Sequence, residues 1–74
     1  APREHAVLEI LIMKMGKTVS KQALADGLFT MSEEASQDAI EVYIHRLRKK
    51  LEAGDAAIMT LRGLGYLLQQ RHAP

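Results

Sequence analysis

Two stretches of sequence decide the fold of this chain: SQDAIEVYIHRLRKKLE at residues 36–52 and IMTLRGLGYLL at residues 58–68. In the first stretch, apolar residues recur at i, i+4, i+7 and i+11, namely Ile40, Ile44, Leu47 and Leu51. This spacing is the period of an amphipathic helix. Ser36 is the predicted N-cap, and Asp38 lies in the first turn, where the helix dipole favours a negative charge. The second stretch predicts a β-hairpin, because two β-compatible runs (58–61 and 66–68) flank the turn sequence Arg62-Gly63-Leu64-Gly65.

The upstream sequence predicts two further helices. The first runs from about Pro2 to Met15, and its apolar stripe is Val7, Leu8, Leu11, Ile12 and Met15, with Glu4, Glu9 and Lys14 placed elsewhere. Gly16 is the predicted stop, because glycine readily adopts the left-handed conformation that ends helices. The second helix is capped by Ser20 and runs to about Leu28, with Ala23, Leu24 and Leu28 predicted to be buried. The predicted order is helix, helix, helix, hairpin, an α+β and mainly helical domain.

Composition narrows the class of protein. Seventy-four residues with 47% hydrophobic and 26% charged side chains indicate one globular domain. The absence of cysteine excludes disulfides and thiolate metal sites, and it is consistent with a reducing cytoplasm. No apolar run approaches the ~20 residues that span a bilayer, and no signal peptide is evident. The four methionines (Met13, Met15, Met31 and Met59) are interpreted as gap-filling core residues.

Charge is distributed unevenly along the chain. Residues 1–42 carry four basic and seven acidic groups, a net charge of −3, whereas residues 43–74 carry six basic and two acidic groups, a net charge of +4. This asymmetry favours one face that binds a polyanion and another that meets a different partner. The simpler interpretation is that the charges cluster on solvated faces without a partner.

The third predicted helix has a face suited to DNA. At about 100° per residue, the side opposite the apolar stripe is centred on Val42, Arg46 and Lys49, and it is flanked by Ala39 and His45. Val42 would contact a thymine methyl group, and Arg46 would bind guanine O6 and N7. Phosphate contacts are assigned to Lys49, Lys50 and Arg48, and a groove or phosphate contact to Arg62 at the hairpin tip. The alternative is a solvated basic face with i,i+4 pairs, such as Arg48–Glu52 or Glu41–His45.

The sequence resembles a known family at these same residues. VYIHRLRKKLE (42–52) and IMTLRGLGYLL (58–68) closely resemble the C-terminal effector domain of OmpR/PhoB-type response regulators, and PREHAVLEILIMKMGKTVSKQALADGLF (2–29) resembles the first two helices of that family. The match covers nearly the whole chain and looks most like the tricarboxylate-transport (TctD-like) branch. The resemblance implies a bacterial, cytoplasmic transcription regulator with a winged helix-turn-helix fold.

The resemblance also implies roles for individual residues. Base-facing positions would be Ala39, Val42 and Arg46, positions facing bases or phosphates would be Tyr43, His45, Arg48 and Lys49, and the wing would act through Thr60 and Arg62. The loop at about 29–35, with Glu33 and Glu34, would contact RNA polymerase, unless it is a solvated loop without a partner. Double-stranded DNA is therefore the expected partner, bound by a dimer on direct repeats.

The sequence departs from the family pattern in two respects. The small N-terminal sheet and the receiver domain of the family have no counterpart in these residues, so we expect a fragment of a longer two-domain regulator. Asp38 stands where many relatives have a basic or neutral residue, and Leu67 where arginine is common. Both departures predict a weaker phosphate clamp and a low affinity for an isolated monomer.

The sequence bears on two other classes of function, an enzyme and a protein-docking module. An enzyme or a metal site is disfavoured, because His5, His45 and His72 are scattered and no carboxylate pair or glycine-rich phosphate loop accompanies them. No cofactor is expected. A protein-docking module remains the alternative, since winged-helix folds also serve as docking platforms. In such a module, Arg46 and Arg62 would be replaceable by neutral residues and binding would hardly depend on salt.

Overall fold

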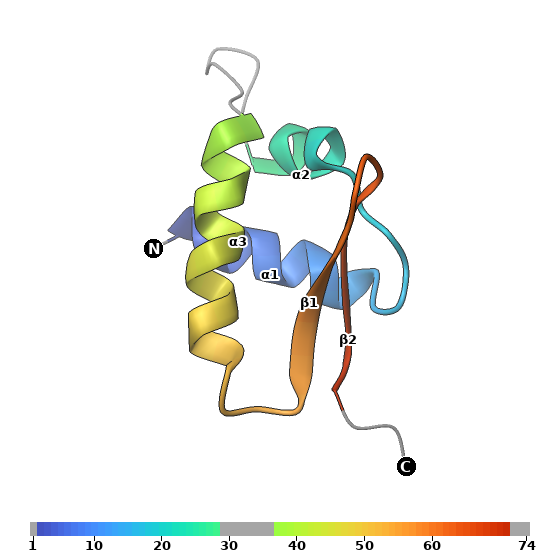
Figure 1. The fold of residues 1–74 in the computed structure, drawn as a ribbon. Helices are drawn as coiled ribbons and strands as arrows, with labels where there is room; N and C mark the ends of the chain where they lie inside the picture. The colour runs from blue at the N-terminus through green and yellow to red at the C-terminus, as the bar shows by residue number, and fades with distance from the viewer. Residues whose placement is uncertain (1, 29–36, 72–74) are drawn as a thin grey trace.

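The computed structural model describes residues 2–28 and 37–71, and it confirms the predicted order of elements. The helices are α1 (Pro2–Met13), α2 (Lys21–Leu28) and α3 (Gln37–Leu51), and the strands are β1 (Ala56–Leu61) and β2 (Gly65–Gln70). Figure 1 shows α3 crossing α1, with α2 beside the beginning of α3 and the hairpin alongside both long helices. Among the described residues, no helix is long and apolar enough to cross a lipid bilayer.

The core lies where the three helices and the hairpin meet. The predicted stripe of α3 is confirmed, because Ile40, Ile44 and Leu47 are buried and Leu51 packs against them at the edge. The other members of the core come from α1, α2, the segment between them and the hairpin: Val7, Leu11, Val19, Leu24, Ala25, Ile58, Tyr66 and Leu68. A domain of this size gains most of its stability from burying such side chains, so this cluster fixes the orientation of α3.

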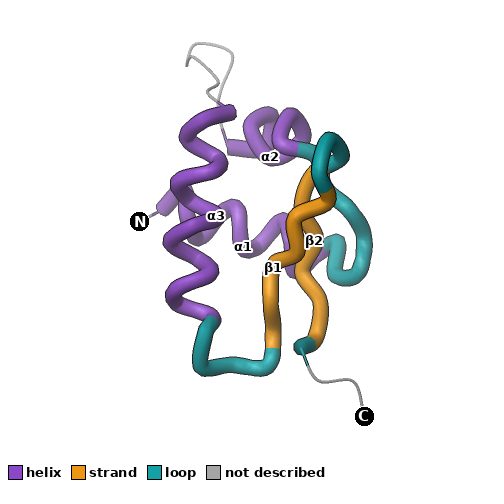
Figure 2. Tube along the Cα trace, viewed as in Figure 1, coloured by secondary structure: helices purple, strands orange, loops and turns teal. Residues whose placement is uncertain are grey.

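The strands of the hairpin are longer than predicted, and β2 also bridges to a residue outside the hairpin. Its antiparallel register pairs Ile58 with Leu68 and Thr60 with Tyr66. Between α1 and α2, Val19 forms a bridge to Tyr66, with hydrogen bonds from Val19 N to Tyr66 O (2.7 Å) and from Tyr66 N to Val19 O (2.8 Å). The connection between α1 and α2 therefore runs beside β2, as Figure 2 shows. This bridge ties the beginning of α2 to the hairpin.

Helix termini agree with the sequence in part. Ser20 caps α2 as predicted, because its Oγ accepts a hydrogen bond from Ala23 N at 3.0 Å. Helix α1 ends at Met13, two residues before the predicted end, and Gly16 follows with a φ of 81°. The predicted N-cap, Ser36, lies outside the described residues.

Several predictions about burial are wrong. Ala23 is exposed, and Ala25 occupies the buried position beside Leu24. Of the residues predicted to be core, Ile12, Met13, Met15 and Met59 are exposed, Met13 by 82%, and Met31 lies outside the described residues. Glu4, in contrast, was placed on the polar side of α1 and is only 3% exposed. The physical reason is that Glu4, Val7 and Leu11 share one buried face of α1, at i, i+3 and i+7. Met13 lies about 180° around the helix from Glu4, and Met15 lies after the helix has ended.

Candidate nucleic-acid interface

The outer face of α3 is open to solvent, as the helical period predicts. Val42 is 47% exposed, and Arg46, Lys49 and His45 are exposed beside it. Ala39 is half-buried at one margin of this face. An exposed valine among cations offers an apolar contact next to charged donors, which is the combination that base edges in a major groove require.

The cations of this face are available for an external partner. Within the described part of the chain, Arg46 and Lys49 form no ion pair or side-chain hydrogen bond. Neither of the alternative i,i+4 pairs is formed there, because Glu41 pairs with Lys21 and Arg48 is bound to the hairpin. The solvated face with internal i,i+4 pairs is therefore not the arrangement that this helix adopts.

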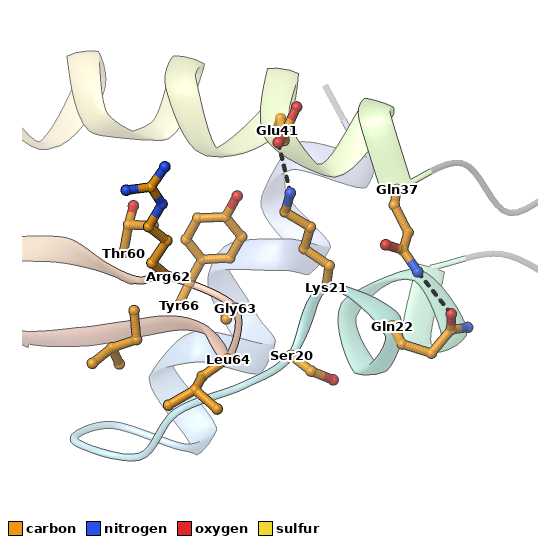
Figure 3. A pocket seen from close by; sticks show the side chains of 12 residues that line it. Ser20, Lys21, Gln22, Gln37, Glu41, Thr60, Arg62, Gly63, Leu64 and Tyr66 are labelled. Carbon is orange, nitrogen blue, oxygen red and sulfur yellow. Dashed lines mark hydrogen bonds and ion pairs between the residues drawn. The ribbon is translucent and has the colours of Figure 1, made fainter.

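The hairpin carries a second exposed cation. Arg62 follows β1 directly and is exposed, and Leu64 at the tip is 66% exposed. Figure 3 shows Arg62 and Thr60 on the hairpin side of a groove whose opposite wall is formed by α2 and α3. The tip thus projects from the domain with one arginine and one apolar side chain.

This groove separates α3 from the tip of the hairpin. It has a volume of about 530 Å³, and its helix side includes Lys21, Gln37 and Glu41. Lys21 Nζ lies 2.6 Å from Glu41 Oε1, and this hydrogen bond raises the pKa of Lys21. Gln37 Nε2 donates to Gln22 Oε1 at 2.9 Å, which links the first turns of α3 and α2 (Figure 3). The helix side of the groove is thus polar, and these side chains are held by one another, whereas Leu61, Leu64 and Tyr66 line the hairpin side.

Arg48 takes a different direction from the one the sequence suggested. Its guanidinium donates from Nε and Nη2 to Ile58 O, at 3.2 and 3.1 Å, and from Nη2 to Thr60 Oγ1 at 2.5 Å. The predicted phosphate ligand is therefore bound to β1 in the free protein, and the wing residue Thr60 is its partner. A phosphate contact by Arg48 stays a prediction, and it would have to replace these bonds.

Lys50, the other predicted phosphate ligand on a flank of α3, is also occupied. Its Nζ lies 2.5 Å from Glu4 Oε1, near the beginning of α1. The hydrogen bond from Lys50 lowers the pKa of Glu4, against the opposing effect of burial, and the charges of Lys50 and Arg46 add to the lowering. The sequence analysis missed the burial of Glu4, although Glu4 shares a helical face with Val7 and Leu11 at i, i+3 and i+7. Its pairing with Lys50 depends on the end of α3 lying over it, which no local pattern indicates.

Of the remaining candidate residues, some lie in or beside the core and others fall outside the described residues. Tyr43 is half-buried and packs against the core at the edge of the apolar stripe of α3. Tyr66 is 5% exposed and is a packing residue of the core. Glu33 and Glu34, with the rest of the loop at 29–35, lie outside the described residues.

Three helices followed by an antiparallel hairpin, with an exposed face on the third helix, define a winged helix-turn-helix protein. A family model described as "Transcriptional regulatory protein, C terminal" matches residues 1–68. The chain belongs to this family, and the resemblance to OmpR/PhoB-type effector domains is thereby confirmed.

The chain is also similar in sequence to individual regulators. Transcriptional regulatory protein TctD of Salmonella typhimurium is 49% identical over 69 residues, which supports the TctD-like branch, and response regulator protein PmrA of Pseudomonas aeruginosa is 43% identical over 70 residues. These matches cover 93% and 95% of this chain but only 31% of either relative, so the chain spans about a third of their length.

Solved structures show the same fold. The C-terminal domain of the nisin resistance regulator NsrR has a TM-score of 0.78 and 40% identity, over 93% of this chain and 71% of that one. The DNA-binding domain of response regulator AdeR, solved in complex with an intercistronic region, has a TM-score of 0.76 and 22% identity, over 92% of this chain and 72% of that one. The winged-helix architecture predicted from the sequence is thus confirmed by two independent neighbours.

Proposed function

We propose that this chain binds double-stranded DNA sequence-specifically, as the output domain of a cytoplasmic two-component response regulator that controls transcription. Helix α3 enters the major groove, and the hairpin reaches the adjacent minor groove. The observation that carries the proposal is the outer face of α3, where Val42 is exposed one turn before Arg46 and two turns before Lys49, two cations that no other described residue pairs with. Membership of a family of transcriptional regulators supports it.

The proposal gives each exposed residue a task. Val42 contacts a thymine methyl group, and Arg46 binds a guanine through its two terminal nitrogens. Lys49 neutralises a phosphate, which adds affinity without sequence preference. At the margins, Ala39 allows close approach of a base pair, and His45 and the edge of Tyr43 contact the backbone. Arg62 enters the minor groove or rests on phosphate from the hairpin tip.

The first experiment is a fluorescence-anisotropy titration against random-sequence duplex and against a site selected from a random library. Arg46→Ala is expected to cost roughly 1–3 kcal/mol on the selected site and to relax specificity at one base pair. Lys49→Ala is expected to weaken all sequences similarly and to flatten the slope of log K against log salt by about one unit. The matched control is Lys14→Ala, which removes the same charge from the turn after α1, away from α3.

Three results would contradict parts of the proposal. Binding that is absent at low salt would indicate a protein-docking module. Binding that is equal for the parent and for Arg46→Ala on both duplexes would show that Arg46 does not read bases. Loss of affinity in Lys14→Ala as large as in Lys49→Ala would show that only net charge matters.

Two finer parts of the proposal concern partners. The domain acts on direct repeats as a dimer, and the loop at 29–35, with Glu33 and Glu34, contacts RNA polymerase. An acidic loop is poorly suited to phosphate, which supports a protein partner there. Sedimentation on a duplex with one or two copies of the selected site tests the dimer. Transcription by purified polymerase tests the loop, through a Glu33→Lys, Glu34→Lys variant whose DNA affinity is measured in parallel. No catalytic residue, metal or cofactor belongs to this function.

A further inference from the structure

Arg48 joins the two elements that are proposed to read DNA. It lies on the flank of α3 that faces the hairpin, about 200° around the helix from Arg46. Its guanidinium makes three hydrogen bonds to β1, two to Ile58 O and one to Thr60 Oγ1. A planar guanidinium can hold two acceptors at once in a fixed geometry, whereas a lysine ammonium on its flexible stem cannot reproduce that fork.

The acceptors of Arg48 are placed where the hairpin leaves the core. The side chain of Ile58 is buried, so its carbonyl is a fixed anchor. Thr60 lies two residues further along the strand, on the same face, and Arg62 follows two residues after that. Beyond Thr60, the open groove of about 530 Å³ lies between α3 and the hairpin tip. Arg48 therefore links α3 to the hairpin at this level, while the bridge from Val19 to Tyr66 holds the hairpin on its other side.

A second arginine holds the base of the hairpin. Arg71 Nη1 donates to Glu52 O at 2.7 Å, just after the end of α3, and Arg71 N donates to Asp55 O. This contact fixes where the hairpin starts, but it leaves the tilt of the strands toward α3 to contacts further along. Arg48 supplies that contact in the middle of β1.

We propose that Arg48 is a positioning residue, which acts through Ile58 O and Thr60 to hold Arg62 at a fixed distance from Arg46. This inference rests on the proposed function. The spacing between neighbouring grooves is set by the duplex, so a wing with the right tilt in the free protein loses less conformational entropy on binding. Arg48 therefore contributes to affinity for a specific site without neutralising a phosphate.

Three variants test this role. Arg48→Lys keeps the charge and loses the fork, Arg48→Ala loses both, and Thr60→Val removes only the hydroxyl acceptor. We expect Arg48→Lys to weaken binding to the selected site about as much as Arg48→Ala, roughly 5-fold, and Thr60→Val to weaken it about 2-fold, because neutral partners contribute less. The salt slope should stay at the parental value in all three variants.

A second comparison, in a variant that lacks Arg62, distinguishes a positioning role of Arg48 from a general effect on the stability of the domain. If Arg48 acts through the wing, the loss caused by Arg48→Lys should fall below about 2-fold in an Arg62→Ala background, although the two side chains share no bond. In the DNA-free protein, residual dipolar couplings of amides 60–66 should change relative to those of α3 in Arg48→Lys, and those of α1 should not. Urea unfolding of each variant confirms that the comparison is made on folded protein.

Opposite results overturn the inference. If Arg48→Lys binds like the parent and Arg48→Ala lowers the salt slope by about one unit, Arg48 is a phosphate ligand. If Arg48→Lys weakens binding equally with and without Arg62, it does not act through the wing. If Arg46→Ala and every Arg48 variant leave DNA binding unchanged, the proposed function itself fails, and the dipolar couplings then show whether the contact still orients the hairpin.

Discussion

Gly65 is the position where a single added methyl group should damage the fold most. Its φ is 143°, in the region that residues with a Cβ rarely adopt. An added Cβ would lie 2.7 Å from Ser20 Cα and closer still to Val19 O. Both are backbone atoms, Val19 O within the bridge to Tyr66 and Ser20 Cα next to it, so no side-chain rotation relieves the overlap. Gly65→Ala must therefore push the segment before α2 away from the hairpin.

The size of the effect follows from two contributions. Holding alanine at this φ costs roughly 1–3 kcal/mol. The two bridge hydrogen bonds, at 2.7 and 2.8 Å, are then weakened or lost, and each contributes about 0.5–1.5 kcal/mol. Together we expect a loss of about 4 kcal/mol. A domain of this length has a free energy of unfolding of roughly 4–11 kcal/mol, so Gly65→Ala should leave the domain marginally stable or unfolded.

Urea unfolding followed by far-UV circular dichroism measures this loss. The matched control is Gly63→Ala, because Gly63 also has a positive φ, 78°, but no atom lies within 4 Å of its added Cβ. The control should cost only the backbone strain, about 1–2 kcal/mol. The reasoning is refuted if the two variants differ by less than about 0.5 kcal/mol, the usual scatter between independent sites. Faster amide exchange at Val19 and Tyr66 in Gly65→Ala, if it still folds, would locate the damage.

Two further predictions concern the helices. Ser20→Ala should lower the free energy of unfolding by about 1 kcal/mol, because Ala23 N loses the hydrogen bond to the cap. Ser20→Asp should restore most of this stability in the same urea assay. Equal stability of all three proteins would contradict the capping role. In the folded state the pKa of Glu4 lies below its ordinary value of 4.5, because Lys50 donates a hydrogen bond to the carboxylate. The pair therefore stabilises the fold fully above about pH 4.5, and this contribution is lost as the pH falls through the pKa of the folded state. The melting temperature of the parent should therefore decline more steeply below about pH 4.5 than that of Glu4→Gln, and parallel melting curves would show that the pair contributes nothing.

The sequence predicts best what depends on local periodicity. The stripe of Ile40, Ile44 and Leu47 fixes one face of α3, and the opposite face then follows from helical geometry alone. Two glycines between two β-compatible runs likewise specify a hairpin, because glycine readily adopts the positive φ that a tight turn needs. Both features were predicted with the correct residues, and strand length was the main error.

What the sequence could not predict depends on contacts between distant elements. Glu4 shares a helical face with Val7 and Leu11, but its pairing with Lys50 depends on the end of α3 lying over the beginning of α1. The bridge from Val19 to Tyr66 joins residues 47 positions apart, and no local signal marks it.

The same limit applies to the candidate site, and it changes how charge should be counted. Residues 43–74 carry six cations, which together would give a salt slope of about −5.4 if each met a phosphate. Arg48, Lys50 and Arg71 are bound within the described structure, to β1, to Glu4 and to Glu52 O. Arg46, Lys49 and Arg62 remain, and three cations give at most about −2.7. A measured slope near the smaller value would mean that the internal contacts survive on DNA, whereas a slope near the larger value would mean that binding breaks them and releases the wing from α3.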